Sequence, residues 1–460
     1  MTQRLAAIDL GAESGRVVVG EVADGILRMR VVHRFATGAR QDPDHWRWDL
    51  PAIQAGILAG LVRAAAQGPL AAIGIDTWGV DGTWIGAAGH PLAAPVSYRD
   101  PRTVGWPERL DAELGAGELF RRSGIAPMAF NTVYQLVAAH RAGAAPAGDA
   151  QWLFMPDLLA HWLSGEAACE WTVAGTSGLC RAGRMAWDLE LIGRLGLPAG
   201  WFGRLVRSGT PLAPVRAAIW DALGTGTPPP MVVASAGHDT AAAFAAAAPP
   251  AGSAVVSCGT WSLVGAIVDA PVTTPDVLVR RLSNEIAADG RIRLLTNVMG
   301  LWVVQQCRAA FAAAGRDRDY AALTALAQAA PAPAVPLDVD DPRFFAPSTA
   351  ADPMPGRVAA WYRDRGHPVP ADDGAVVRAV TEGLAAAYAR TCANLAAVVG
   401  QAPRALHVVG GGVKNRLLLD LAGRACGIPI VPGPSEATAI GNLSVVAAGA
   451  GIPIRGVDEA

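Results

Sequence analysis

The chain has 460 residues, of which 52% are hydrophobic, and its mean hydropathy is +0.28. This length exceeds what one ordinary core accommodates, so two domains of roughly 200 or more residues each are expected. The formal net charge of −2 argues against nucleic acid or an anionic membrane surface as the main partner. The sequence has neither a signal-peptide layout nor an uninterrupted apolar run of ~18 residues, which predicts a cytoplasmic protein that does not enter the membrane.

Cysteine and lysine usage excludes several classes of site. The six cysteines are scattered without a CxxC pair, which favours reduced thiols over a disulfide framework or a zinc site. Lys414 is the only lysine of the chain. Sites that depend on a P-loop lysine or on a protein-kinase strand lysine are therefore excluded.

The first 22 residues predict a β-hairpin with a polar turn. An apolar strand over residues 5–11 carries Asp9, residues 12–16 form a small, hydroxyl-bearing turn, and residues 17–22 return as a second strand. Such a turn can direct backbone N–H groups at an anion, and Asp9 could hold a hydrated Mg²⁺. An ordinary hairpin is the alternative. A helix is expected over residues 51–66, with proline at its first turn.

The next dense segment, residues 71–82, is an apolar strand that runs into a turn with Asp76, Trp78 and Asp81. Carboxylates and an indole at a strand end suit a sugar, whose hydroxyls need acceptors and whose ring needs an apolar plate. A structural tryptophan with two turn aspartates explains the pattern equally well. Helices are expected to open at residues 131 and 155, and residues 126–209 otherwise look helical and loop-like, without assigned chemistry.

Near the midpoint of the chain, Asp239 lies where a strand ends and a helix begins. Residues 231–234 predict a short buried strand, and the alanine-rich residues 241–248 predict a helix that ends before two prolines. This junction places the Asp239 carboxylate at the mouth of a sheet. The alternative is that Asp239 only caps the following helix.

The second half repeats the opening pattern. Residues 253–265 predict a strand, a Gly-Thr turn and a second strand, which suggests two related halves that hold a polyphosphate from both sides. A long helix is expected over residues 376–399. A strand over residues 406–409 leads into Gly410–Gly412, where a glycine run lets the backbone approach a ligand closely. Asn415 replaces the third glycine of a dinucleotide fingerprint, so a dehydrogenase is not favoured. A helix from residue 415, a strand over 428–431 and a helix from 436 complete the chain.

These elements, in this order, resemble the FGGY family of carbohydrate kinases. Within the family, the sequence motifs are most similar to those of the L-rhamnulose kinases. The matching segments span nearly the whole chain and are AIDLGAESGR from Ala7, IGIDTWGVDG from Ile73, NTVYQL from Asn131, MPDLL from Met155, GHDTA from Gly237, SCGTWSLVG from Ser257, NVMGLW from Asn297, HVVGGGVKN from His407 and GPSEATAIGN from Gly433.

The resemblance implies an α/β fold with two ribonuclease-H-like domains of the actin/hexokinase ATPase type, residues 1–244 and 245–460, with a cleft between them. It implies Asp239 as the catalytic base and a sugar site of Gly79, Asp81, His238, Thr240 and Asn297. It implies Mg²⁺ at Asp9, and a monomer or homodimer whose substrates are a sugar and ATP. The ATP-binding residues would be Ala12, Glu13, Ser14, Gly15, Arg16, Thr260, Gln305, Gly410, Gly411 and Gly412.

Two residues depart from the family pattern. Glu13 lies in the phosphate turn where these kinases usually carry Ser or Thr, and a carboxylate there should repel a triphosphate unless it points away or shares the metal. Gly82 stands where the L-rhamnulose kinases usually have Phe, so the sugar pocket is expected to be roomier or differently shaped. The expected reaction is phosphorylation of the 1-hydroxyl of L-rhamnulose. The alternatives are another ketose or polyol (L-fuculose, L-ribulose, xylulose) and a catalytically weak sugar- or nucleotide-binding regulator.

Overall fold

The computed structural model describes residues 2–147 and 149–458, and the chain divides into two compact units. The first unit comprises residues 1–246, 268–293 and 437–460, and the second comprises residues 247–267 and 294–436. The units follow packing rather than sequence order, and the expected domain boundary after residue 244 stays a prediction. Two later segments return to the first unit, because the last helix covers one face of its sheet.

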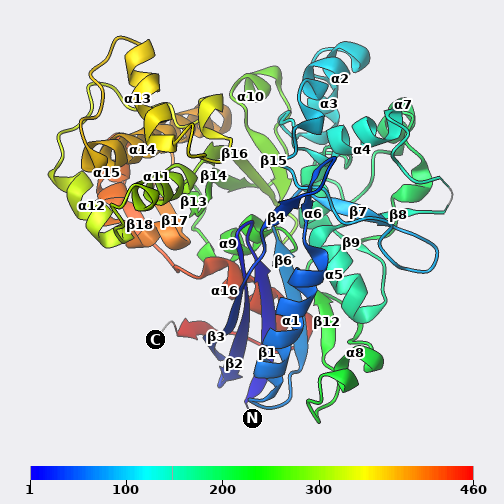
Figure 1. Cartoon of the computed structure of the whole chain (residues 1–460). Coiled ribbons are helices and arrows are strands. Elements are labelled where there is room, and N and C mark those ends of the chain that lie inside the picture. The colour runs from blue at the N-terminus through cyan, green and yellow to red at the C-terminus, as the bar shows by residue number, and fades with distance from the viewer. Residues whose placement is uncertain (1, 148, 459–460) are drawn as a thin grey trace. The chain divides into compact units, whose positions relative to one another are not determined.

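A seven-stranded sheet forms the centre of the first unit (Figure 1). Its central strand, β1, is antiparallel to β2 and parallel to β6, which is in turn parallel to β12. The strand β19 lies beside β3 at the sheet edge. In spatial order the strands are β11 (Thr210–Pro214), β12 (Met231–Ala234), β6 (Ala72–Thr77), β1 (Gln3–Leu10), β2 (Ser14–Ala23), β3 (Ile26–Ala36) and β19 (Gly456–Asp458).

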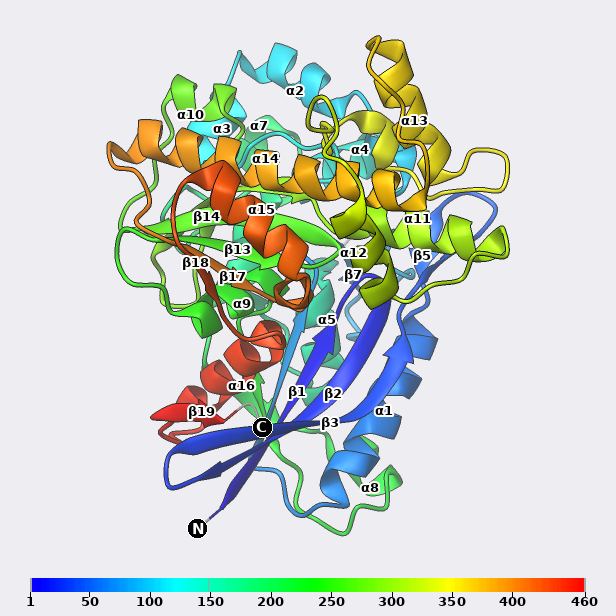
Figure 2. The same ribbon diagram turned by 90° about the vertical axis from the view of Figure 1, so that its left-hand side faces the viewer.

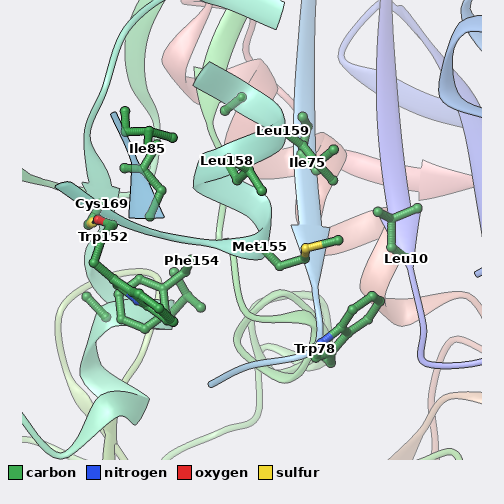
Figure 3. Packing of buried hydrophobic residues seen from close by; sticks show 14 of the residues in the cluster. Leu10, Ile75, Trp78, Ile85, Trp152, Phe154, Met155, Leu158, Leu159 and Cys169 are labelled. Atoms are coloured by element: carbon green, nitrogen blue, oxygen red, sulfur yellow. The ribbon is translucent and has the colours of Figure 1, made fainter. Parts of the chain in front are cut away.

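Both faces of this sheet are buried, and the two-residue period of a strand sorts the side chains between them. On β1, Ala6, Ile8 and Leu10 join the larger core with helices α1 (Leu50–Ala65) and α5 (Met155–Ser164). Figure 3 shows this core, with Leu158 and Leu159 of α5 near Ile75 of β6. The other face packs on α16 (Ala437–Gly449). Asp9 alternates with Leu5 and Ala7 along β1 and therefore lies on that second face.

The remaining elements of the first unit lie between β3 and β12, directly after β12, or in residues 268–293. Residues 126–209 contain short strands as well as the expected helices and loops. These elements are β4 (Ala39–Gln41), β5 (Trp46–Trp48), β7 (Gly82–Ile85), α2 (Trp106–Leu114), α3 (Glu118–Ser123), α4 (Thr132–Arg141), β8 (Gln151–Phe154), β9 (Cys169–Glu170), α6 (Trp171–Ala174), α7 (Leu189–Arg194), β10 (Leu205–Val206), α8 (Ala217–Ala222), α9 (Asp239–Ala247), α10 (Pro275–Val279) and β15 (Ser283–Ile286).

The strands β13 to β18 form a second sheet, with the order β15-β16-β14-β13-β17-β18. Its strand β13 repeats the role of β1, being antiparallel to β14 and parallel to β17, which is parallel to β18. The strands are β13 (Ala254–Cys258), β14 (Trp261–Val268), β16 (Ile292–Met299), β17 (Leu406–Val409) and β18 (Ile430–Pro432). The repeated hairpin is thus the centre of each sheet.

A long helix, α14 (Asp373–Val399), dominates the helical part of the second unit (Figure 2). Asp372 caps its start by accepting a hydrogen bond from Ala375 N, and Gly400 ends it in the left-handed conformation. α14 packs against α12 (Tyr320–Ala329) and α15 (Arg416–Cys426), and α11 (Trp302–Ala313) and α13 (Met354–Asp364) lie nearby. None of the helices within residues 2–147 and 149–458 has the length and hydropathy needed to cross a membrane.

Candidate active site

Asp239 is the first residue of α9 and follows the buried strand β12. Its side chain is 34% exposed, and its Oδ1 accepts hydrogen bonds from Thr240 N at 2.6 Å and Thr240 Oγ1 at 3.1 Å. The amides of Ala241 and Ala242 instead donate to the carbonyl of His238. Through Oδ1 the carboxylate thus holds an amide of the first turn of α9, while part of the side chain stays exposed. Burial raises the pKa of Asp239; the proximity of His238 lowers it, and the charge of Asp9 raises it further.

The ring of His238 connects Asp239 to a buried ion pair. His238 Nε2 lies 3.4 Å from Asp239 Oδ1, while Nδ1 lies 3.2 Å from Nη2 of Arg293 and 3.4 Å from Oε2 of Glu285. Arg293 and Glu285 are paired at 3.0 Å, and Arg293 is completely buried. A guanidinium group can only donate, so a neutral ring that accepts from Arg293 at Nδ1 carries its proton on Nε2, toward Asp239.

Two loops that the sequence assigns to the sugar meet at His238. A Cβ atom on Gly79 would lie 3.4 Å from His238 Nε2, so the ring lies beside the face of Gly79 that lacks a side chain. The backbone of Thr77 donates to the carbonyl of Gly237 at 2.9 Å and joins the two loops at their base. Gly79, His238, Thr240 and Asp239 therefore form one cluster at the ends of β6 and β12.

Asp81 is completely buried and accepts four hydrogen bonds. Oδ2 accepts from the indole N–H of Trp48 at 2.7 Å, the indole N–H of Trp78 at 3.1 Å and Tyr98 N at 3.0 Å, and Oδ1 accepts from Gln135 at 3.2 Å. Burial raises its pKa to about 6, against the opposing effect of these donors. In this arrangement the carboxylate holds the two indoles, whose ring centroids are 4.0 Å apart and whose planes are tilted by 35°.

The neighbours of Asp81 show why this turn is fixed. Val80 has φ +68°, which is unusual for a β-branched residue, and its carbonyl accepts a hydrogen bond from Thr132 Oγ1 at 2.7 Å. A Cβ atom at Gly82 would lie 2.3 Å from the carbonyl oxygen of Leu153 and 2.7 Å from the Trp152 ring. Trp152 and Leu153 fill the space beside Gly82, and the expectation that the sugar pocket is roomier or differently shaped stays a prediction.

Asp9 and Asp76 are adjacent carboxylates on the paired strands β1 and β6. Asp9 Oδ2 accepts two hydrogen bonds from Arg16, at 2.9 and 2.5 Å. Asp76 is completely buried; its Oδ2 accepts from Asn442 of α16, and its Oδ1 has no partner. Burial, together with the charge of Asp9, holds the pKa of Asp76 well above its usual range.

The turn between β1 and β2 contains the residues Ala12–Arg16 that the sequence assigns to ATP. Gly11 N donates to Ser14 O at 3.0 Å, and Thr37 Oγ1 donates to the carbonyl of Gly11 at 2.6 Å, so the turn is anchored at its base. Glu13 and Ser14 are exposed, while Gly15 is buried against Leu10 and Phe35. The side chain of Glu13 is therefore turned toward solvent.

In the second unit, Cys258 brings Thr260 close to the glycine run. A Cβ atom at Gly410 would lie 2.9 Å from Cys258 O, and one at Gly412 would lie 2.1 Å from Cys258 Sγ. No atom lies within 4 Å of a Cβ built on Gly411, so the middle glycine borders open space. The glycines thus permit the close approach of this loop to the β13–β14 hairpin.

The other residues assigned in the second unit lie at the start of α11 and on β16. Trp302 N donates to Thr260 O at 3.2 Å, which joins α11 to the hairpin. Gln305 follows in the first turn of α11, and its buried Oε1 has no partner. Asn297 is half-buried on β16.

Three charged residues that contact this site are missed by reasoning from sequence: Glu170, Glu285 and Arg293. Glu170 lies in the region to which no chemistry was assigned, yet its Oε2 accepts a hydrogen bond from Gly237 N at 3.0 Å. A signal exists for Arg293, because a charge between Ile292 and Leu294 in an apolar strand needs a buried partner.

Comparison with known proteins identifies the family. The profile for the FGGY family of carbohydrate kinases, N-terminal domain, matches residues 5–245, and the profile for its C-terminal domain matches residues 254–450. The chain belongs to the FGGY family of carbohydrate kinases. It is homologous to rhamnulokinases: it is 38% identical over 450 residues to the rhamnulokinase of Bacteroides thetaiotaomicron, covering 97% of this chain and 91% of the relative. It is also 38% identical to the rhamnulokinase of Klebsiella pneumoniae, covering 95% and 88%.

Solved structures of FGGY kinases share the fold. The gluconate kinase of Lactobacillus acidophilus matches with a TM-score of 0.78 at 16% identity, covering 98% of this chain and 90% of that one. The glycerol kinase of Plasmodium falciparum with ADP matches with a TM-score of 0.72 at 13% identity, covering 97% and 90%. The prediction of two α/β domains with the actin-like ATPase fold is confirmed, and with it the prediction of a carbohydrate kinase with rhamnulokinase homologues.

Proposed function

We propose that this FGGY kinase transfers the γ-phosphoryl group of ATP to the 1-hydroxyl of L-rhamnulose, with Asp239 as the general base. The arrangement around Asp239 carries the proposal, because a partly exposed carboxylate lies beside His238 at the end of β12. Identity of 38% over nearly the whole chain to rhamnulokinases supports the sugar.

The chemistry follows from these groups. The Asp239 carboxylate accepts the proton of the sugar 1-hydroxyl while the oxygen of that hydroxyl bonds to the γ-phosphorus. The bond from the γ-phosphorus to the bridging oxygen of ADP breaks at the same time. Phosphoryl transfer passes through a loose transition state, so positioning and charge neutralisation dominate. A base that orients the hydroxyl typically contributes about 10²–10⁴-fold. The His238 Nε2–H, Gly79 and Thr240 would orient the sugar, with Asn297 as a further contact and Asp81 as the anchor of the indoles.

The residues proposed for the nucleotide and its metal come from the glycine-containing turns and strand ends described above. FGGY kinases use ATP, and we assign its binding to residues 12–16, Thr260, Gln305 and Gly410–Gly412. Among the described residues, no group of three His, Cys, Asp or Glu side chains could hold a metal by itself. Mg²⁺ bound to nucleotide usually takes one or two carboxylates, waters and phosphate oxygens. Asp9, with the unpartnered Oδ1 of Asp76 beside it, fits that need. The ion would neutralise phosphate charge.

The test is ADP release with Mg-ATP across L-rhamnulose, L-fuculose, L-ribulose, L-xylulose, D-xylulose, glycerol and no sugar. We expect the highest kcat/KM with L-rhamnulose, and a loss of about 10²–10⁴-fold in kcat for Asp239→Asn. A higher kcat/KM with another sugar would replace L-rhamnulose and leave the kinase class intact. Wild-type turnover by Asp239→Asn would refute the base. Size-exclusion chromatography decides between the expected monomer and homodimer.

A further inference from the structure

Beneath the loop that carries Asp239 lies a buried set of hydrogen bonds from the segment Cys169–Ala174, which no sequence motif assigns. Glu170 is 1% exposed. Its Oε2 accepts from Gly237 N at 3.0 Å, from Thr172 N at 2.9 Å and from Thr172 Oγ1 at 2.5 Å. One carboxylate oxygen thus joins the start of α6 to the residue two positions before the base.

Thr172 makes the second connection to the same loop. Its hydroxyl donates to Glu170 and accepts a hydrogen bond from His238 N at 3.2 Å. The amides of two consecutive loop residues, Gly237 and His238, are therefore both held from one side by the Glu170–Thr172 pair. Because Asp239 comes next in the chain, these bonds fix the direction in which its carboxylate leaves the loop.

The pair is itself anchored on its far side. Glu170 Oε1 accepts from Ser208 Oγ at 2.5 Å, and Ser208 accepts from the indole N–H of Trp171 at 2.8 Å. The backbone N–H of Glu170 donates to Asp157 Oδ1 at 2.9 Å. Asp157 belongs to α5, which packs against β6 and β12, so the pair is tied to the helix that supports both site strands.

The loop packs against this anchor without a gap. A Cβ atom on Gly237 would lie 3.1 Å from Glu170 Oε2, 3.2 Å from Pro156 and 3.5 Å from Val173. Figure 3 shows Cys169, the neighbour of Glu170, beside Trp152 in the core of the same unit. A rigid core therefore extends to the backbone of the loop.

We infer that Glu170 and Thr172 are positioning residues, which fix the Gly237–Asp239 backbone so that the Asp239 carboxylate meets the sugar hydroxyl in a reactive geometry. This inference rests on the proposed role of Asp239. A misplacement of about 1 Å can cost on the order of 10²-fold in rate. Loss of the Thr172 hydroxyl should therefore lower kcat and leave the KM for ATP unchanged.

The test compares Thr172→Val, which removes the hydroxyl at constant shape, with Thr172→Ser, which keeps it, in the full-length kinase. We expect Thr172→Val to lower kcat about 10- to 100-fold and Thr172→Ser to remain within about threefold of wild type, with the KM for ATP unchanged in both. Thr172→Ala is measured alongside. It shows whether the second methyl group of valine, and not the missing hydroxyl, lowers kcat, and it replaces Thr172→Val if that variant fails to fold.

Hydrogen exchange of the peptide that spans residues 235–240 gives an independent readout. We expect the His238 amide to exchange about fivefold or more faster without the Thr172 hydroxyl, because its hydrogen bond to that hydroxyl is lost, whereas the Gly237 amide keeps its bond to Glu170. Equal kcat and equal exchange in Thr172→Val and Thr172→Ser would overturn the inference even if Asp239→Asn is inactive. Full activity of Asp239→Asn would instead refute the base, and the exchange rates would then decide whether the backbone is held.

Discussion

Arg293 Nη2 lies 3.2 Å from Nδ1 of His238, and no part of Arg293 is exposed to solvent. Arg293 is neutralised by Glu285, with Nη2 and Oε2 3.0 Å apart, so a buried ion pair supports the ring that faces Asp239. Breaking such a pair leaves one buried charge uncompensated, whereas removing both charges does not. We therefore expect single and double variants of this pair to differ in stability.

Arg293→Met should destabilise the protein by about 3–5 kcal/mol, because Glu285 would remain buried without its counterion. Adding Glu285→Gln should recover part of this loss. The measurement is the midpoint of urea unfolding. Arg291→Met serves as the matched control, since Arg291 forms an exposed pair with Asp289, and it should change stability by about 1 kcal/mol or less. Equal effects of the two arginine substitutions would contradict the importance of the buried pair.

The pH dependence of turnover should report Asp239. Burial raises its pKa above the ordinary value of 3.8, and a protonated carboxyl cannot accept the sugar proton. Turnover should therefore fall as the pH is lowered through a value above 3.8. His238 lowers the pKa of Asp239, so His238→Gln should move this acidic limb to higher pH. The measurement is kcat between pH 4 and 8, and a limb at the same pH in both proteins would rule out this coupling.

Asp81 predicts a pH dependence of stability. Its pKa is about 6 in the folded protein and near 3.8 when unfolded, so between these values the folded state binds more protons. The contribution of Asp81 to the free energy of unfolding is therefore fully present at low pH and is lost as the pH rises through about 6. The loss amounts to about 3 kcal/mol. Asp81→Asn cannot titrate. The difference in unfolding midpoint between wild type and Asp81→Asn should change across pH 4–7, and a constant difference would contradict the assignment.

The sequence predicts the elements that form each sheet because the local pattern determines them. The Met231–Ala234 strand, the helix that opens at Met155 and the long helix that ends at Val399 lie where apolar runs, caps and glycines place them. The same reasoning finds Asp239, since a carboxylate at a strand–helix junction is a local feature. It also anticipates a repeated hairpin, which the two sheets contain.

Long-range contacts account for what the sequence does not predict. Glu170 and Gly237 are 67 positions apart, and the Asp76–Asn442 hydrogen bond joins residues 366 positions apart. No periodicity relates such partners. The close approach at Gly82 is hidden for the same reason, because only the fold brings β8 against β7 and fills the space with Trp152.

Gly441 provides a test of how tightly α16 holds α9, the helix that begins at Asp239. A Cβ atom at Gly441 of α16 would lie 1.9 Å from the carbonyl oxygen of Ala242 in α9, a distance that real atoms do not reach. Gly441→Ala must therefore push α9 away from α16. Because α9 begins at Asp239, we expect a loss of about 1–3 kcal/mol in stability together with a lower kcat.

The control for this substitution is Gly193→Ala in α7, where an added Cβ meets no atom within 4 Å. It should be neutral or stabilise by up to about 1 kcal/mol, since alanine restricts the unfolded chain more than glycine does. Thermal unfolding and kcat are measured for both variants. If Gly441→Ala loses stability without any loss of kcat, then the contact holds the two helices together but does not place Asp239, and the base must be fixed by the loop before it.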